Sequence, residues 1–291
     1  MNKTISVVLP AKNEANNLKT LLPKLQSIPG ISEILVINDG STDETKAIAT
    51  ELGARVISHP YSMGNGAAIK TGARNATGDI LIFMDADGQH DPADIPLLLK
   101  KMDEGYAMVV GARHIESQAS QFRKFANIFY NRLASMMTGH KIEDLTSGFR
   151  AAKAEEFRKF LYLLPNGFSY PTTSTMAFFR SGFPVAYIPI HAGIREGKSH
   201  IRLIRDGTRF FIIILRIGAL FSPMRLFLPI SGATFLTGLS YYGYTYFTSG
   251  RFTNMSALLI LSALIIFMIG ILSEQVSSLH YRDFERSRWI K

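Results

Sequence analysis

Two carboxylates, Asp85 and Asp87, lie one residue apart and directly follow a short apolar run at residues 80–84. Branched and aromatic side chains in such a run are typical of a buried strand. Open α/β sheets bind ligands beyond the carboxyl ends of their strands, so we expect both carboxylates at a ligand-binding edge. Oxygen ligands at this spacing suit Mg²⁺ or Mn²⁺, which usually bridge to phosphates. The pair therefore indicates a metal site for a diphosphate, although Asp-x-Asp also occurs in ordinary turns.

The elements that must position this pair alternate between strand and helix patterns over residues 1–197. The predicted strands cover 6–9, 33–37, 54–58, 80–84 and 107–110, and the predicted helices cover 16–25, 43–52, 66–76 and 92–105. This order predicts an α/β fold with a mostly parallel sheet covered by helices on both faces. The turns at its carboxyl edge carry Asn13, Glu14, Asp39 and Asp85, which is where a nucleotide would lie.

Composition and motif spacing exclude several classes of protein. The 291 residues contain no cysteine, so a disulfide framework, a thiolate zinc site and a cysteine nucleophile are all absent. The Gly64-Asn65-Gly66 stretch lacks a third glycine at the dinucleotide-binding spacing, and the chain has no Walker A motif. The first apolar stretch is too short for a secretory signal and is broken by Pro10. We therefore expect the N-terminal part to stay in the cytoplasm.

Two long segments without charge follow the α/β part of the chain. One lies between Arg225 and Arg251, and the other covers residues 252–273. Each could cross about 30 Å of hydrocarbon as a helix, and their small residues would let two helices pack closely. They predict a transmembrane hairpin over 224–277, with spans at about 226–248 and 254–276. A buried helical hairpin of a soluble core is the alternative.

The net charge of +9 is concentrated beside these segments. An amphipathic basic helix is predicted over 198–223, with its charged residues at helical spacing: Lys198, Arg202, Arg205, Arg209 and Arg216. A basic tail follows at 278–291. The positive-inside rule then places both flanks, and the domain at 1–197, in the cytoplasm. This distribution favours an anionic membrane surface over nucleic acid as the partner of the positive charge.

Further motifs carry a resemblance to a known family. Pro10 with Asn13-Glu14, then Asn38-Asp39-Gly40-Ser41-Thr42-Asp43, Gly64-Asn65-Gly66-Ala67-Ala68 and Asp85-Ala86-Asp87-Gly88-Gln89-His90-Asp91-Pro92 resemble the family 2 glycosyltransferases of the Rossmann-like GT-A fold. Gly111-Ala112-Arg113, Ser147-Gly148-Phe149-Arg150 and Arg195-Glu196-Gly197-Lys198-Ser199 are similar to the branch of dolichyl-phosphate mannose synthase and bacterial polyprenyl-phosphate glycosyltransferases. The hairpin resembles the membrane anchor of the bacterial members. Asn38 and Asn65 depart from the Asp and Lys that many members have there.

The resemblance implies roles for these residues. A divalent metal, Mg²⁺ or Mn²⁺, would be held by Asp85, Asp87 and Gln89. The nucleotide-sugar would contact Pro10, Asn13, Glu14, Asp39, Gly66, Asp85, Ala86 and Asp87. The acceptor phosphate would contact Arg113, Arg123, Asn127, Arg195 and Lys198, and arginine suits bidentate phosphate binding. The catalytic set would be Asp85, Asp87, Arg113, Arg123 and Arg195. For the cations, an ordinary salt bridge is the alternative, and His90 could orient a metal ligand or serve the turn.

The implied activity is inverting, metal-dependent transfer of one sugar from a nucleotide-sugar, with a UDP-sugar favoured, to a polyprenyl phosphate such as undecaprenyl or dolichyl phosphate. The phosphate oxygen of that acceptor, with a second pKa of about 6, is already a nucleophile at neutral pH and needs no strong general base. The expected location is the bacterial inner membrane, with the catalytic domain cytoplasmic. The resemblance also allows a homo-oligomer such as a tetramer, and no nucleic-acid partner is expected.

Four alternatives stay open at this point. The donor could be GDP-mannose, or the acceptor could be another lipid such as diacylglycerol, or a protein, whose hydroxyl nucleophile would require a general base. Processive polysaccharide synthases resemble one another in a Gln-x-x-Arg-Trp sequence that precedes their membrane spans. That alternative is disfavoured, because the only tryptophan here, Trp289, lies after both apolar segments. The non-enzyme alternative is an inactive membrane scaffold, which the intact Asp85, Asp87 and Gln89 disfavour.

Overall fold

The computed structural model divides the chain into two units, residues 1–132 with 141–210 and residues 133–140 with 211–291. It describes residues 3–113, 121–167, 169–190, 211–212, 215–216, 218–220 and 222–289. Within these ranges, the side chains of residues 121–126 and 278–289 are not described.

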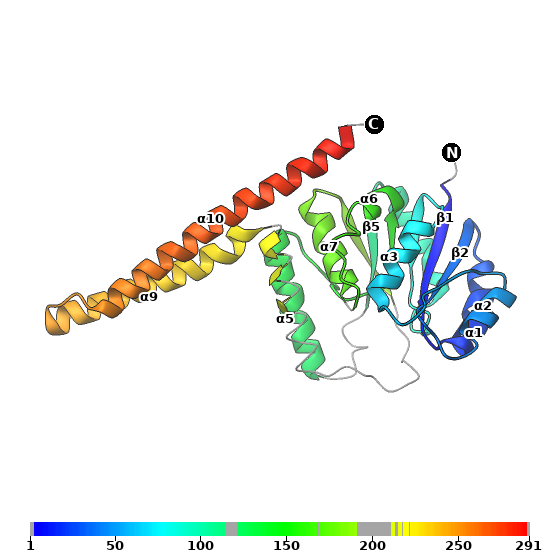
Figure 1. The fold of residues 1–291 in the computed structure, drawn as a ribbon, viewed down its shortest axis with the longest axis horizontal. Coiled ribbons are helices and arrows are strands. Elements are labelled where there is room, and N and C mark those ends of the chain that lie inside the picture. The colour runs from blue at the N-terminus through cyan, green and yellow to red at the C-terminus, as the bar shows by residue number, and fades with distance from the viewer. Residues whose placement is uncertain are drawn as a thin grey trace. The chain divides into compact units, whose positions relative to one another are not determined.

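The larger unit is built on a seven-stranded sheet with the order β3-β2-β1-β4-β6-β5-β7 (Figure 1). The strands are β1 Ile5–Ala11, β2 Ile31–Asn38, β3 Arg55–Ser58, β4 Ile80–Phe83, β5 Met108–Arg113, β6 Arg150–Lys153 and β7 Val185–Ile190. The pairs β1–β2, β1–β4, β2–β3 and β5–β7 are parallel, whereas β6 runs antiparallel to β4 and β5. The predicted mostly parallel α/β sheet is confirmed.

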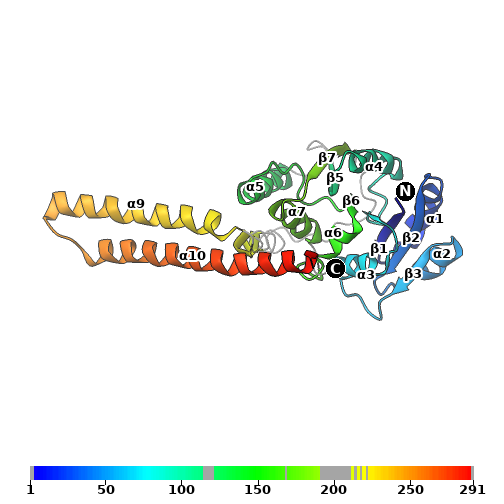
Figure 2. The same cartoon turned by 90° about the horizontal axis from the view of Figure 1, so that it is seen from above.

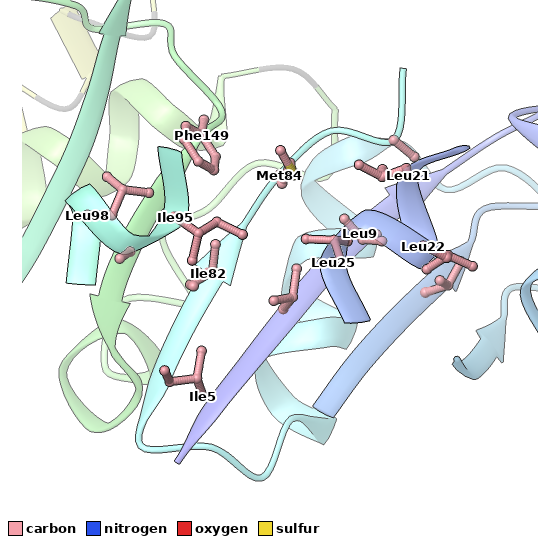
Figure 3. Close-up of a cluster of buried hydrophobic side chains, with 14 of the residues drawn as sticks. Ile5, Leu9, Leu21, Leu22, Leu25, Ile82, Met84, Ile95, Leu98 and Phe149 are labelled. Atoms are coloured by element: carbon pink, nitrogen blue, oxygen red, sulfur yellow. The ribbon is translucent and has the colours of Figure 1, made fainter. Parts of the chain in front are cut away.

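Helices cover both faces of this sheet (Figure 2). They are α1 Ala15–Gln26, α2 Thr45–Glu51, α3 Asn65–Asn75, the 3₁₀ helix η1 Pro92–Asp94, α4 Ile95–Asp103, α6 Ala154–Arg158 and α7 Tyr170–Arg180. Helix α5 Gln121–Thr138 belongs to the larger unit up to residue 132 and to the smaller unit from residue 133. On one face, α1 and α4 pack on alternate residues of β1 and β4 such as Leu9 and Ile82 (Figure 3). On the other face, Phe83 contacts Phe157 of α6 and Tyr170 of α7. Because both faces are covered, β4 is apolar at every position.

The smaller unit contains a hairpin of two long helices, α9 Pro223–Ser249 and α10 Asn254–Trp289 (Figure 1). Small residues bring the two helices close together. The Ser231 hydroxyl donates to the Ala263 carbonyl at 2.9 Å, and a Cβ at Gly238 would lie 2.9 Å from the Leu259 side chain. The predicted close packing of an apolar helical hairpin is therefore confirmed.

The two predicted spans differ in the structure. Within the described residues, one helical segment, Asn254–Ser277 of α10, is long and apolar enough to cross a membrane. Helix α9 has sufficient length, but its tyrosines, threonines and glycines make it less apolar, so the first predicted span, at 226–248, is not supported on the same criterion. Helix α10 also continues to Trp289, through most of the predicted tail. Of the predicted basic helix at 198–223, residues 198–210 lie outside the described residues.

Candidate active site

The loops after β1 and β2 are joined by hydrogen bonds between their polar residues. Asn13 has a left-handed φ of 58°, a conformation that asparagine tolerates better than most residues. Its backbone N–H donates to the Ser41 hydroxyl at 3.0 Å, and its side-chain oxygen accepts from the Thr42 N–H at 2.9 Å. The Glu14 N–H donates to the Thr45 hydroxyl at 2.9 Å. The two loops, both predicted to contribute contacts to the nucleotide-sugar, are therefore linked by hydrogen bonds into one structure.

Asp39, at the end of β2, is 5% exposed and accepts hydrogen bonds from a third loop. His59 Nδ1 lies 2.7 Å from Asp39 Oδ1, and the Ser62 hydroxyl donates at 2.8 Å. The backbone N–H groups of Met63 and Gly64 donate at 2.8 and 2.9 Å. Burial raises the pKa of Asp39, but these donors outweigh burial and lower it below its ordinary value. In this structure the carboxylate organises the 59–64 loop, and its contact with a nucleotide stays a prediction.

The carboxylates Asp85 and Asp87 follow β4, and both are half-buried. Gly88 has a φ of 73° and turns the chain, so that the Gln89 N–H donates to Asp87 Oδ1 at 3.2 Å. Asn65, which replaces the lysine of many family 2 glycosyltransferases, directs its amide toward Asp85 Oδ1 at 3.4 Å. This turn therefore presents carboxylate oxygens at the sheet edge expected to bind ligands.

These residues could bind a hard divalent cation whose remaining coordination positions a substrate would fill. Among the described residues, no group of three or more His, Cys, Asp or Glu side chains could hold a metal. Mg²⁺ does not need such a cage, because it is usually held by one or two carboxylates together with waters and substrate phosphates. Asp85 and Asp87, with the amide oxygen of Gln89, would supply the protein's share of the ligands.

Arg113, at the end of β5, forms a bidentate pair with Asp144 that sequence reasoning missed. Arg113 Nε and Nη2 donate to the two Asp144 oxygens at 2.8 and 3.1 Å. Burial raises the pKa of Asp144, but the hydrogen bonds and charge of Arg113 outweigh this and lower it. Asp85 and Asp87 also help to raise the Arg113 pKa. The positive charge therefore lies within electrostatic reach of the two carboxylates, and the side chain is 25% exposed.

His90 is buried beside this pair and stacks on a neighbouring ring. Its imidazole lies 5.2 Å from the Phe149 ring with an interplanar angle of 18°. Burial, and after it the charge of Arg113, lower the pKa of His90 to about 4, although Asp87 and Asp144 act to raise it. His90 is therefore neutral at pH 7. Of its two predicted roles, the structure shows packing of the turn on Phe149.

The N-terminus of α3 is closed by the chain at residues 165–167. The N–H groups of Gly66 and Ala67 donate to the carbonyls of Gly167 and Asn166 at 3.0 and 2.9 Å. A Cβ at Gly66 would lie 2.0 Å from the Pro165 carbonyl oxygen, so only glycine fits. Gly66 thus serves a close approach of two backbone segments, and its N–H is already bonded. The predicted contact of Gly66 with the nucleotide-sugar stays a prediction.

Comparison with known proteins identifies the family of the chain. Residues 6–161, more than half of the chain, match the description Glycosyl transferase family 2. The chain belongs to glycosyl transferase family 2. Residues 222–279 match the GtrB C-terminal hairpin. The predicted family, the predicted GT-A fold and the predicted glycosyltransferase activity are confirmed.

This family 2 glycosyltransferase is similar to known proteins from two organisms. Glycosyltransferase AglJ of Haloferax volcanii is 25% identical over 295 residues, which cover 97% of this chain and 96% of AglJ. Glucosyl-3-phosphoglycerate synthase of Mycobacterium tuberculosis, solved with Mn²⁺, UDP-glucose and phosphoglyceric acid, aligns with a TM-score of 0.63 at 23% identity, over 74% of this chain and 80% of that chain. The same enzyme with Mg²⁺ and UDP gives a TM-score of 0.62 at 24% identity, over 74% and 79%. These structures show the shared fold.

The remaining predicted residues of this glycosyltransferase are placed only in part. Pro10 is half-buried in β1, and Ala86 is 2% exposed between the two carboxylates. Arg123 and Asn127 are both in α5, but the side chain of Arg123 is not described. Arg195 and Lys198 lie outside the described residues. The structure therefore brings Asp85, Asp87, Gln89 and Arg113 to one edge, and the roles of the other predicted cations stay predictions.

Proposed function

We propose that this glycosyltransferase transfers one sugar from a nucleotide-sugar, with a UDP-sugar favoured, to a polyprenyl phosphate at the cytoplasmic face of a bacterial inner membrane. The observation that carries the proposal is the half-buried pair Asp85 and Asp87 at the end of β4, within electrostatic reach of Arg113. The apolar hairpin of the same chain supports a lipid acceptor. The M. tuberculosis enzyme solved with Mn²⁺ and UDP-glucose supports the choice of donor and metal.

At this edge of the sheet, the acidic residues would bind the cation and the basic residue would bind the acceptor phosphate. When bound, Mg²⁺ or Mn²⁺ neutralises the leaving nucleoside diphosphate. Asp85, Asp87 and Gln89 would offer oxygen ligands to that cation, while Arg113 would hold the acceptor phosphate. Arg113 keeps its orientation through Asp144, and preorganised charge of this kind lowers the barrier without reorganisation. Arg123, Asn127, Arg195 and Lys198 are proposed to complete the phosphate contacts.

The proposed acceptor explains why a strong general base is not required. A polyprenyl phosphate carries an ionised oxygen at neutral pH, since its second pKa is about 6. Attack by this oxygen on the anomeric carbon, opposite the leaving diphosphate, would invert the configuration. Rate would then come from positioning and charge neutralisation. A homo-oligomer such as a tetramer is compatible with this chemistry and is part of the proposal only by resemblance.

The test is transfer of radiolabel from UDP-sugars to undecaprenyl phosphate by the purified full-length protein. We expect a lipid-soluble product that is lost with EDTA, restored by Mn²⁺ and absent in Asp87→Ala. Asp103→Ala is the matched control, because that carboxylate is on the surface with 71% of its side chain exposed. Product undiminished by both EDTA and Asp87→Ala would overturn the metal assignment. Parallel reactions with GDP-mannose, dolichyl phosphate and diacylglycerol distinguish the other donors and acceptors.

A further inference from the structure

Arg150, the first residue of β6, is a fully buried cation whose hydrogen bonds join two segments of the chain. Its exposed fraction is 0%. Nη1 donates to the Pro171 carbonyl at 3.0 Å and to the hydroxyls of Ser174 and Thr175 at 2.8 and 3.1 Å. Nη2 donates to the Ser147 carbonyl. Arg150 therefore ties the loop before β6 to the first turns of α7.

Tyr170, the first residue of α7, holds the next carbonyl of the same loop. Its side chain is 1% exposed, and its hydroxyl donates to the Gly148 carbonyl at 2.8 Å. The guanidinium carbon of Arg150 lies 5.6 Å from the centre of the Tyr170 ring, within the range of a cation–π contact. Two buried side chains that contact each other thus fix two successive carbonyls, those of Ser147 and Gly148.

Gly148 is the point at which this loop meets the proposed metal site. A Cβ at position 148 would lie 2.8 Å from Asp85 Oδ2 and 3.3 Å from the Tyr170 hydroxyl oxygen. Gly148 is not among the glycines with positive φ, so its backbone conformation is open to alanine. The space that Asp85 occupies, and not backbone strain, is what requires glycine here.

We propose that Arg150 and Tyr170 are positioning residues that hold the Gly148 backbone against Asp85 and thereby fix this carboxylate for a divalent cation. The inference rests on the proposed function, because it takes Asp85 as a metal ligand. None of Gly148, Arg150 and Tyr170 would itself touch the cation. They would act as the outer residues of metal sites do, by setting the orientation of a ligand through the groups packed against it.

The long-range charge of Arg150 agrees with this role. Burial lowers the pKa of Arg150, while Tyr170, Tyr187, Asp144 and Asp85 act to raise it. Among the described residues Arg150 forms no ion pair within 4.0 Å. Asp144 and Asp85 therefore offset the burial of this charge only in part, and the net pKa of Arg150 is lowered. A side chain needed only to fill the core would not require a charge at this position.

The experiment compares two substitutions with two controls of the same chemical type. Gly148→Ala places a methyl group against Asp85, and Tyr170→Phe removes only the hydrogen bond to Gly148. The controls are Gly167→Ala, where a Cβ has nothing within 4 Å, and Tyr162→Phe, whose residue is 70% exposed. Binding of Mn²⁺ to each full-length protein, with UDP present, is measured from the electron paramagnetic resonance signal of free Mn²⁺.

We expect Mn²⁺ affinity to fall about tenfold or more in Gly148→Ala and by a smaller factor in Tyr170→Phe, with both controls unchanged. Excess Mn²⁺ should restore much of the transfer rate, which a general loss of structure would not allow. The midpoint of thermal unfolding should shift by less than about 3 °C. If Gly148→Ala shifts the unfolding midpoint by more than this, the inference is judged from the Mn²⁺ affinity of Tyr170→Phe alone.

Unchanged Mn²⁺ affinity in the substituted proteins, with a native protein that binds Mn²⁺ and transfers sugar, would overturn this inference and leave the proposed function intact. A native protein that binds no Mn²⁺ in the presence of UDP would overturn the metal assignment and the inference together. Equal weakening in Tyr170→Phe and Tyr162→Phe would also overturn it, because the effect would then be independent of Gly148.

Discussion

The loops after β2 and β4 both present aspartates at the carboxyl edge of the sheet, Asp39 in the first and Asp85 with Asp87 in the second. The surroundings of these carboxylates differ. Asp39 is 5% exposed and accepts hydrogen bonds from the backbone and side chains of the 59–64 loop at 2.7 to 2.9 Å. Asp85 and Asp87 are half-buried, and the donors from Asn65 and Gln89 lie at 3.4 and 3.2 Å. The first carboxylate organises a loop of the protein, and the second pair is the one proposed to bind a ligand.

This difference separates stability from activity. A buried carboxylate with strong donors favours the folded state, because unfolding exchanges those donors for water while breaking the loop that it organises. A half-buried carboxylate at an edge adds little to folding, but it can contribute several kcal/mol to catalysis through a cation. Substitutions at the two loops should therefore affect different measurements.

The largest effect is expected for Asp87→Asn. Loss of one charged metal ligand should reduce sugar transfer by about a thousandfold, which corresponds to about 4 kcal/mol. The free energy of unfolding in urea should change by less than about 1 kcal/mol, since the side chain is half-buried. Transfer is measured with saturating donor and Mn²⁺. A large loss of stability in this variant would remove the contrast between the two loops.

Arg113 and Asp144 extend the comparison to a second buried carboxylate. Arg113→Met should cost about 3 kcal/mol of unfolding free energy, because it leaves Asp144, which is 6% exposed, buried without its cation. Adding Asp144→Asn should recover about 1 to 2 kcal/mol, since it removes the uncompensated charge while keeping an acceptor for the N–H groups of Thr146 and Ser147. If Asp144→Asn costs as much unfolding free energy in Arg113→Met as it does in the native protein, the two residues are not coupled.

The sequence alone predicted those elements that a short run of neighbouring residues identifies. The apolar runs and the turn residues after them identified β1, β2, β4 and β5 and their shared edge. The strand β6 was not predicted, because residues 150–153 read Arg-Ala-Ala-Lys and lack the branched and aromatic residues typical of strands. Its conformation comes from pairing with β4 on one side and β5 on the other.

The location of the site could be predicted from the sequence, but the hydrogen-bond partners of its residues could not. The spacing of Asp85 and Asp87 indicated the metal edge, whereas the donors to Asp39 come from a loop that no local pattern connects with it. Asp144 was missed because its partner Arg113 is 31 positions away in the sequence. Hydrogen-bond partners that meet only through tertiary structure decide which aspartate is structural, and a residue type alone does not reveal them.

Asp39→Asn is expected to have a smaller effect, which depends on pH. The donors lower the pKa of Asp39 in the folded protein below its ordinary value of 3.8. Its contribution to stability is therefore complete at pH values above the unfolded pKa, and it is lost as the pH falls through the folded pKa. Asp39→Asn should cost about 2 kcal/mol at pH 7, and urea unfolding near pH 3 should show a smaller difference. A cost that does not change with pH would exclude the ionised carboxylate as its cause.

The smallest effect should come from Thr71→Val, at the outer end of the Asp39 network. The Thr71 hydroxyl lies 2.9 Å from His59 Nε2, and Nδ1 of the same ring faces Asp39. Removing the hydroxyl should cost about 1 kcal/mol of unfolding free energy and leave sugar transfer unchanged. Thr50→Val is the matched control, because that hydroxyl bonds the Lys46 carbonyl on the exposed face of α2. If both variants lose equal stability, then the network ends at His59, and the contrast between the two loops depends on the donors that touch Asp39 itself.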